Sequence, residues 1–557
     1  MSIIKKELEL ISLQNNNSSE PRKSSGQNFL TGALIISLAS FVVKVISMLF
    51  RIPLTNLVGS TGMGYYGVAY TVYNLMITIS ASGLSVAISK IVAESVSLGK
   101  HKDVKTVIKV SFSTFIVIGA LLTLIVFFFS KPIAGMMKNT QVDIILKAVA
   151  PAILIVSVAS VIKGYFQGYA NMIPTAIANL IEVLGKLAFG LGIAYYMQIK
   201  GFDTPYVVAG AVGGVTLGSL LSLIYLVIRI LADRSRKNQA HNDDLAGDTY
   251  KQMIKRFMIL LIPIAIGSLT TTLANLIDTG MVFDRLQTIS WINEERANYL
   301  YGLYSSYAET VFNVPVTVLL TICVPIIPAI SSAFATKDKL KLNSTVNSSM
   351  KLCMLFAMPC GVGLCVLAEP VLALLYRNPE EVSKAAELLQ VMAPSIILVC
   401  AAQLITPILQ AIGKTYIPVI NIIIASIVKI VLNYFLIADP RLNVMGAVIS
   451  NIIMFLVLLV LNVLSMRRYL TVKINLVDIF LKPAIGAIAC GAAAYGLHYI
   501  TKDILGGKIA TLLSVLAAAV IYFVIVFSLR ILTKEDVEML PKGKKIQKVL
   551  EKLHWVG

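Results

Sequence analysis

Residues 29–50 read FLTGALIISLASFVVKVISMLF, and the only charged side chain in this stretch is that of Lys44. A helix rises about 1.5 Å per residue, so a stretch of this length can cross the roughly 30 Å of hydrocarbon in a bilayer. Only helices and closed barrels satisfy their backbone polar groups in lipid, and the sequence lacks the short alternating segments of barrel strands. The stretch therefore predicts a transmembrane helix.

Similar apolar stretches follow along the whole chain and predict an all-α integral membrane protein. Of the 557 residues, 57% are hydrophobic and 14% are charged, whereas a soluble domain carries about 25% charged residues. We expect about fourteen transmembrane helices of membrane-spanning length. They are predicted at residues 29–50, 66–91, 107–129, 144–166, 171–197, 206–231, 257–281, 306–334, 349–376, 386–411, 415–437, 444–466, 479–500 and 508–532.

The distribution of basic residues predicts the orientation of the chain. With the N-terminus inside, Lys and Arg are about threefold more frequent in the inside segments than in the outside loops, as the positive-inside rule requires. This bias predicts a multi-pass protein of a bacterial cell (plasma) membrane with both termini cytoplasmic. The formal net charge of +19 does not indicate nucleic-acid binding, because the basic residues are scattered between apolar stretches and form no single patch.

An internal echo suggests two lobes. Pro174 is followed twelve residues later by Lys186, and Pro418 is followed eleven residues later by Lys429, each lysine within an apolar stretch. Transporters built from two repeats bind substrate between them, near the middle of the bilayer. The predicted parts are a disordered cytoplasmic tail (1–28), a six-helix lobe (29–231), a cytoplasmic linker (232–256), a second six-helix lobe (257–466), two further helices (479–532) and a basic cytoplasmic tail (533–557).

Three stretches resemble a known superfamily. They are FLTGALIISLASFVVKVISMLFRIPLTNLVGSTGMGYY (29–66), GYFQGYANMIPTAIANLIEVLGK (164–186) and ILQAIGKTYIPVINIIIASIVKIVLN (408–433). In this order they resemble the polysaccharide-transporter branch of the multidrug/oligosaccharidyl-lipid/polysaccharide exporter superfamily, which includes the stage V sporulation protein B type and MurJ-type lipid II flippases. The resemblance implies an alternating-access flippase fold with roles in cell-wall synthesis, polysaccharide export or sporulation. It implies that the cargo is a polyprenyl-pyrophosphate-linked saccharide, lipid II or a polysaccharide precursor, moved from the cytoplasmic to the outer leaflet.

Charged residues within the spans are the candidate cargo-binding residues, because an ionised side chain in hydrocarbon is rare and costly. Lys44 and Arg51 are seven residues, or two helical turns, apart and are expected on one face of the first span. The resemblance implies that such a pair lines the cavity and binds the pyrophosphate. A snorkelling lysine and an interfacial arginine are the plain alternatives.

Glu182, Lys186 and Lys429 complete the predicted cargo-binding set. Glu182 and Lys186 stand four residues apart and can pair on one face of a helix. This pair is either a structural ion pair or a cavity cation with a carboxylate that tunes it. Lys429 is the counterpart of Lys186 in the second lobe.

Asn275 and Asp278 are the candidate ion-coupling residues. A carboxylate and an amide within a span can bind Na⁺ or a proton, although a polar contact between helices is the simpler interpretation. The sequence contains no phosphate-binding G-x-x-x-x-G-K-[ST] loop and no H-E-x-x-H zinc motif. We therefore expect a transporter without cofactor or metal, driven by an ion gradient or the membrane potential, and not an enzyme.

Two alternative functions remain open from the sequence. One is a multidrug cation antiporter of the same superfamily, and the other is a non-transporting scaffold of the envelope-synthesis machinery. The segment YAETVFNVP (307–315) carries Glu309 where the resemblance to MurJ-type proteins implies an arginine, which favours the sporulation-protein and polysaccharide branch. The expected partners are a lipid-linked oligosaccharide and membrane lipids, and the chain is expected to be a monomer.

Overall fold

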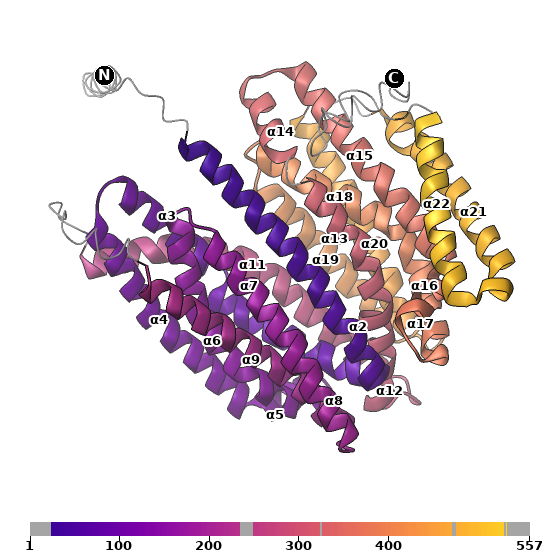
Figure 1. Cartoon of the computed structure of the whole chain (residues 1–557), viewed down its shortest axis with the longest axis horizontal. Coiled ribbons are helices and arrows are strands. Elements are labelled where there is room, and N and C mark those ends of the chain that lie inside the picture. The colour runs from indigo at the N-terminus through magenta and orange to yellow at the C-terminus, as the bar shows by residue number, and fades with distance from the viewer. Residues whose placement is uncertain (1–23, 234–248, 324–325, 471–474, 529–530, 532–557) are drawn as a thin grey trace.

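The computed structural model describes residues 24–233, 249–323, 326–470, 475–528 and 531 (Figure 1). Every regular element within these ranges is a helix, as the apolar stretches predict. The predicted tail 533–557 lies outside the described residues, as do most of the tail 1–28 and most of the linker 232–256.

The first helix group runs from α2 to α9 and is drawn from indigo to magenta in Figure 1. Its elements are α2 (Ser24–Ala81), α3 (Leu84–Ser97), α4 (His101–Phe128), α5 (Ser130–Met136), α6 (Val142–Gly168), α7 (Ile173–Gly185), the π-helical turn η1 (Lys186–Gly190), α8 (Leu191–Ile199) and α9 (Thr204–Leu231). The central helix α6 packs against α2, α3, α4 and α9.

The second helix group runs from α11 to α20 and lies beside the first group. Its elements are α11 (Tyr250–Leu286), α12 (Glu294–Gly302), the π-helical turn η3 (Leu303–Ala308), α13 (Glu309–Cys323), α14 (Ile326–Ala335), α15 (Lys339–Val366), α16 (Ala368–Leu375), α17 (Pro379–Met392), η4 (Ala393–Ser395), α18 (Ile396–Ala411), α19 (Tyr416–Leu436) and α20 (Val444–Tyr469). The chain then continues through η5 (Val477–Leu481), α21 (Lys482–Leu505) and α22 (Gly507–Ser528). This last pair packs on α15, where the Tyr522 hydroxyl donates to the Leu355 carbonyl at 2.6 Å. The division into lobes at 29–231 and 257–466 stays a prediction.

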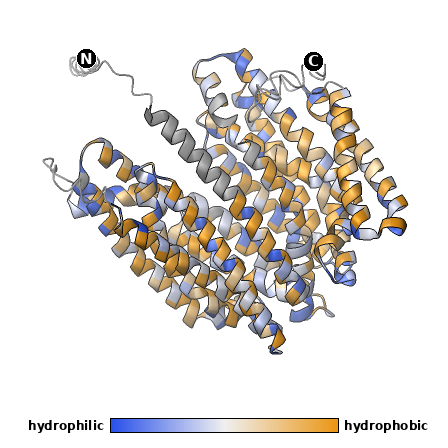
Figure 2. Ribbon diagram, in the orientation of Figure 1, coloured by the Kyte–Doolittle hydropathy of each residue, from blue (hydrophilic) through white to orange (hydrophobic). Residues whose placement is uncertain are grey.

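Within the part of the chain that the structure describes, twelve helical segments are long and apolar enough to cross a membrane. Two features explain the difference from the expected fourteen. The second predicted span and the end of the first fall within one segment, Val42–Ser97, and the eighth, 306–334, is divided between α13 and α14. Figure 2 shows the pattern that a bilayer requires, with hydrophobic helix bodies and hydrophilic residues gathered toward the helix ends. The membrane-protein fold is thus confirmed, while the count of fourteen stays a prediction.

The helix α2 continues well past the predicted end of the first span at residue 50. It contains a sharp break at Gly59, whose φ of 68° and ψ of −175° are not helical. This combination of angles is open to glycine and costly for other residues. A single glycine therefore turns the chain back, and the loop predicted between residues 50 and 66 is wrong, because the flanking residues Leu54, Thr55 and Met63 are fully buried in helical packing.

The two helix groups meet closely at one end of the molecule, here called the junction end. It lies around the break in α2, near the labels α12 and α17 in Figure 1 and opposite the start of α2. There α2 touches α12 so closely that a Cβ atom on Gly302 would lie 1.8 Å from the Ser60 carbonyl oxygen. The Asn139 amide in the first group donates to the Asn298 side chain of α12 at 2.8 Å.

The helix α11 contacts both groups. Near its start, the Phe257 ring packs edge-on against Phe115 of α4, with ring centroids 6.1 Å apart, and Arg256 pairs with Glu94 of α3 at 2.6 Å. Further along, Thr272 reaches Thr78 of α2 at 3.2 Å, and the last third of the helix packs against α19. This single helix therefore connects the first group with the interior of the second.

Candidate functional site

A cavity of about 300 Å³ lies between α2 of the first group and α13 of the second. We call it the cationic cavity, because Lys44 and Arg51 both line it from α2. The facing wall is formed by residues of α13, namely Thr310, Asn313, Val314, Thr317 and Val318. The two-turn spacing that predicts a common face for Lys44 and Arg51 thus agrees with the structure.

The Arg51 side chain reaches across from one helix group to the other. Its Nη2 atom donates to the Ser305 carbonyl at 3.1 Å and lies 3.4 Å from the Ser306 hydroxyl, both on η3. Its Nε atom is buried without a hydrogen-bond partner among the described residues. A guanidinium has five N–H donors, so Arg51 retains donors for an anion in the cavity.

A second cavity, of about 310 Å³, is lined by the second group together with Thr71 of α2, and Asn313 lines both cavities. We call it the carboxylate cavity, because Asp278 of α11 and Glu309 of α13 line it. Lys429 of α19 and Asn275 of α11 also line it. The chain therefore places fixed cations on one side of α13 and two carboxylates with one lysine on the other.

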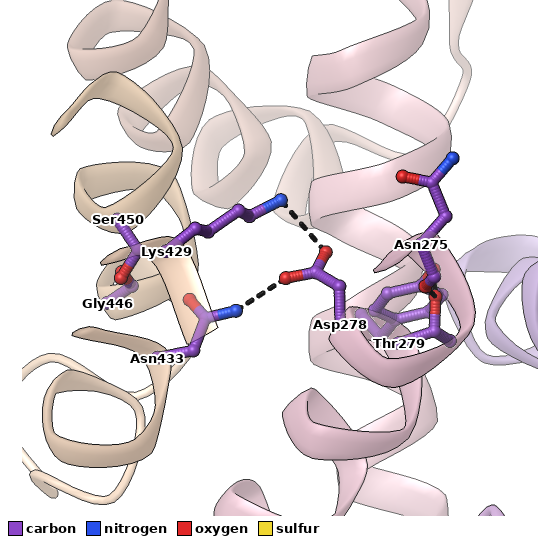
Figure 3. A network of polar contacts seen from close by, with 8 residues as sticks. Asn275, Asp278, Thr279, Lys429, Asn433, Gly446 and Ser450 are labelled. Carbon is purple, nitrogen blue, oxygen red and sulfur yellow. Dashed lines mark hydrogen bonds and ion pairs between the residues drawn. The ribbon is translucent and has the colours of Figure 1, made fainter. Parts of the chain in front are cut away.

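Figure 3 shows how Asp278 is held in the carboxylate cavity. One carboxylate oxygen accepts from the Lys429 ammonium at 2.9 Å, and the other accepts from the Asn433 amide at 2.5 Å. The two ionised side chains are only 13% and 19% exposed. The predicted coupling carboxylate is therefore already paired with a residue that the sequence assigns to the cargo.

The amide beside Asp278 is not the predicted one. Asn275 lies one turn away on the same helix and its side chain points away from the carboxylate in Figure 3. The backbone carbonyl of Asn275 accepts from the Thr279 hydroxyl at 3.0 Å. Asn433 takes the predicted place because it follows Lys429 by one helical turn on α19, so both side chains face α11.

Lys186 is enclosed within the first group. Its ammonium lies 4.5 Å from the centre of the Phe50 ring and 5.1 Å from that of Tyr70, and it donates to the Tyr66 hydroxyl at 3.1 Å. Aromatic faces attract cations, so these rings partly offset the cost of burying the charge. Phe50 immediately precedes Arg51, so Lys186 packs behind the cationic cavity.

Glu182 forms its ion pair with a lysine of another helix and not with Lys186. Glu182 pairs with Lys163 of α6 at 3.5 Å and lies 3.4 Å from the Ser219 hydroxyl of α9. The α-helix α7 ends at Gly185, and the π-helical turn begins at Lys186. This change of winding breaks the regular spacing on which a pair four residues apart depends.

A buried carboxylate at the junction end was not found by the sequence analysis. Glu381 of α17 is 7% exposed and contacts Ser60 of α2 and Tyr307 of η3. Its surrounding sequence, PEEVSKAAELLQ, is typical of an ordinary amphipathic helix. Its hydrogen-bond partner in the first group, Ser60, lies more than 300 residues away in the sequence, so no local pattern points to this contact.

Comparisons with known proteins agree with this architecture. Residues 29–334 match the family described as "Polysaccharide biosynthesis protein", and residues 305–435 match the MatE family. The chain is 26% identical to stage V sporulation protein B of Bacillus subtilis (strain 168) over 519 residues, which are 92% of this chain and 98% of that protein. It is 24% identical to the lipid II flippase MurJ of the same organism over 513 residues, which are 88% of this chain and 93% of that protein.

Solved structures show the same fold. The lipid II flippase MurJ in an inward closed conformation superposes with a TM-score of 0.66 at 16% identity, covering 88% of this chain and 98% of that one. An inward-facing multidrug resistance MATE family transporter of the MOP superfamily gives a TM-score of 0.66 at 14% identity, covering 78% of this chain and 97% of that one. The predicted helical transporter fold is therefore confirmed.

Proposed function

We propose that this chain, which belongs to the polysaccharide biosynthesis protein family and is similar to MurJ and to stage V sporulation protein B of Bacillus subtilis, is a lipid flippase. Its cargo is a polyprenyl-pyrophosphate-linked saccharide, such as lipid II or a polysaccharide precursor. It moves this cargo from the cytoplasmic to the outer leaflet of a bacterial cell membrane by alternating access, as a monomer. Both termini are cytoplasmic, so the junction end faces outward.

The observation that carries this proposal is the position of Lys44 and Arg51 on one cavity between the two helix groups. A pyrophosphate that crosses hydrocarbon without counter-charges has a large desolvation cost. The Arg51 guanidinium can bind phosphate oxygens with two parallel N–H bonds, and the Lys44 ammonium acts as a point charge. The pair therefore lowers the electrostatic barrier for the headgroup.

Movement of the cargo requires the two groups to separate at the junction end. The Arg51 contacts with Ser305 and Ser306 cross between the groups, so an anion that binds Arg51 competes with them. Cargo binding is thereby linked to the contact between the groups. A coupling Na⁺ or proton has to compete with the Lys429 ammonium for Asp278, since that carboxylate is already paired.

The test uses the full chain in liposomes that contain fluorescent lipid II, with a membrane-impermeant quencher to report the leaflet. Replacing both cations (Lys44→Ala with Arg51→Ala) is expected to slow translocation at least about tenfold, because each charge-assisted bond contributes about 1.5–3 kcal/mol. The matched control removes two lysines that pair elsewhere, Lys147→Ala with Lys384→Ala, and is expected to transport normally. If the cavity variant transports like the parent, or complements a flippase-depleted strain, the cationic mechanism is wrong.

Export of cationic drugs is the second candidate function. The MatE match covers residues 305–435, and the carboxylate cavity holds Asp278 and Glu309, which could attract an organic cation. Ethidium export from cells that express the chain, without translocation of lipid II, would favour the antiporter. A scaffold without transport activity would instead tolerate loss of both cavity cations in the complementation test.

A further inference from the structure

The break in α2 exposes a backbone group that needs a partner. The helix restarts after Gly59, and the first N–H groups of a helical segment have no acceptor within that segment. Ser60 is fully buried, so water cannot supply the acceptor. A buried backbone N–H without a partner is costly, and the structure must satisfy it from elsewhere.

Glu381 supplies that acceptor from the other helix group. One carboxylate oxygen accepts from the Ser60 backbone N–H at 3.1 Å and from the Ser60 hydroxyl at 2.7 Å. The second oxygen accepts from the Tyr307 hydroxyl. Among the described residues no Lys or Arg forms an ion pair with this carboxylate, so its charge is stabilised by neutral donors and by the start of a helix, where the macrodipole favours an anion.

Neighbouring contacts extend this connection between the groups. The Asn56 amide donates to the Leu375 carbonyl at 2.9 Å, and the Asn56 side-chain oxygen accepts from the Arg377 N–H at 2.9 Å. The Tyr376 hydroxyl donates to the Ser306 carbonyl at 2.9 Å, next to the residues that Arg51 contacts. The segment that leads into α17 therefore contacts α2 before Gly59, and α17 itself contacts it after Gly59 through Glu381.

We propose that Glu381 is a positioning residue for transport, which caps the restarted half of α2 across the two helix groups. Its carboxylate stabilises the state in which the junction end is closed. When the groups separate there, the hydrogen bonds between Ser60 and Glu381 break. Glu381 therefore shifts the equilibrium between the closed and open states toward the closed one. This inference rests on the proposed alternating access but not on the identity of the cargo.

The experiment measures that balance directly in the purified full chain without cargo. Spin labels are placed on cysteines at Lys200 and Arg441, exposed positions in the α8–α9 and α19–α20 connections, in a chain whose native cysteines are replaced. Pulsed electron–electron double resonance then measures the distance between the two labels. A short distance reports the closed junction end and a long distance reports the open one.

The Glu381→Ala variant is expected to raise the ratio of open to closed populations at least tenfold, a change of about 1.4 kcal/mol. Glu381→Gln is expected to shift it less, because the amide can still accept from Ser60 but carries no charge. The control is Glu380→Ala, since Glu380 is exposed and pairs with Lys384 within the same helix at 2.6 Å. This control should leave the populations unchanged.

An unchanged distance distribution in a folded Glu381→Ala chain would overturn the inference. If that chain does not fold, the double variant Ser60→Ala with Tyr307→Phe removes two donors while it retains the packing, and it must shift the populations in the same direction. A shift of populations without lipid II translocation in the parent would support the role of Glu381 and reject the proposed cargo.

Discussion

At the scale of single residues, the environment of Asp278 differs most from the one that the sequence predicts. It lies in a cavity, yet both of its oxygens are bonded to α19, to Lys429 and Asn433. A carboxylate and an ammonium that are mostly withdrawn from water stabilise one another, and removing either partner exposes the other to an uncompensated cost. The pair therefore fixes the position of α11 against α19.

Single and double substitutions of this pair have different expected costs. Asp278→Asn or Lys429→Met alone should lower the free energy of unfolding by about 1–3 kcal/mol, since each leaves one buried charge without its partner. The double variant should be less destabilised than the sum of the two. Chemical unfolding in detergent measures this coupling, and additive losses would contradict it.

The exposed pair Glu380 and Lys384 offers the matched comparison. Its side chains are 75% and 40% exposed. Surface pairs of this kind contribute between about 0 and 1 kcal/mol. Glu380→Gln and Lys384→Met should therefore change stability little, alone or together.

The charged residues also show what spacing in the sequence can predict. Lys44 and Arg51 lie on one uninterrupted helix, so seven residues place them on one face and one cavity. Glu182 and Lys186 stand at the change from α7 to a π-helical turn, and a lysine of another helix, Lys163, takes the carboxylate. Sequence spacing therefore predicts which side chains share a face within a regular α-helix. It does not predict their partners where the helix changes its winding or where a neighbouring helix supplies a closer charge.

At the scale of elements, the packing of α9 against η1 depends on small residues. A Cβ atom on Gly214 would lie 2.2 Å from the Gly190 Cα atom, which is closer than two such atoms can approach. The Gly-x-x-x-Gly pattern of α9 (Gly210, Gly214 and Gly218) is typical of close helix packing in membranes. The structure agrees with close packing, because a Cβ atom on Gly218 would likewise lie too close to the Glu182 carbonyl oxygen, at 2.4 Å.

Adding one methyl group on this face is expected to separate the helices. Gly214→Ala should lower the free energy of unfolding by about 1–3 kcal/mol, the usual cost of overpacking. The adjacent Gly213→Ala is the control, because its Cβ would meet no atom within 4 Å and alanine favours helix. Melting in detergent distinguishes the two, and equal effects would contradict the packing argument.

The break in α2 marks the limit of prediction for elements. A hydropathy pattern places apolar stretches in the membrane, and it located most helices, including α6 and α9. It could not place the turn at Gly59, because the polar residues and glycines between residues 50 and 66 favour a loop and the carboxylate that bonds to the turn, Glu381, lies in a distant helix. Contacts between segments far apart in sequence leave no local pattern.

At the scale of the whole molecule, the contacts between the groups other than those of α11 gather at the junction end. Besides Glu381, Asn139 bonds to Asn298, and Glu294 accepts from the Thr140 hydroxyl at 2.9 Å. The Gln287 amide donates to the Lys138 carbonyl at 2.7 Å. Polar contacts of this kind can exchange with water, so water can replace them when the groups part there.

Locking the junction end should stop transport reversibly. Cysteines at Asn139 and Asn298, whose amides are bonded in the structure, are expected to cross-link under mild oxidation and to abolish translocation of lipid II. Reduction should restore it. Each single cysteine serves as the control, and undiminished translocation by the cross-linked chain would exclude separation of the groups at this end.

The helix α11 has a consequence for the energy of such a movement. Its beginning is fastened to α3 and α4 by Arg256 and Phe257, and its end to α19 by Asp278. Helices curve at a cost and rarely stay straight when their two ends follow different bodies. Any rotation of one group against the other must therefore bend this 37-residue helix. The energy of bending then contributes to the free-energy difference between the closed and open states.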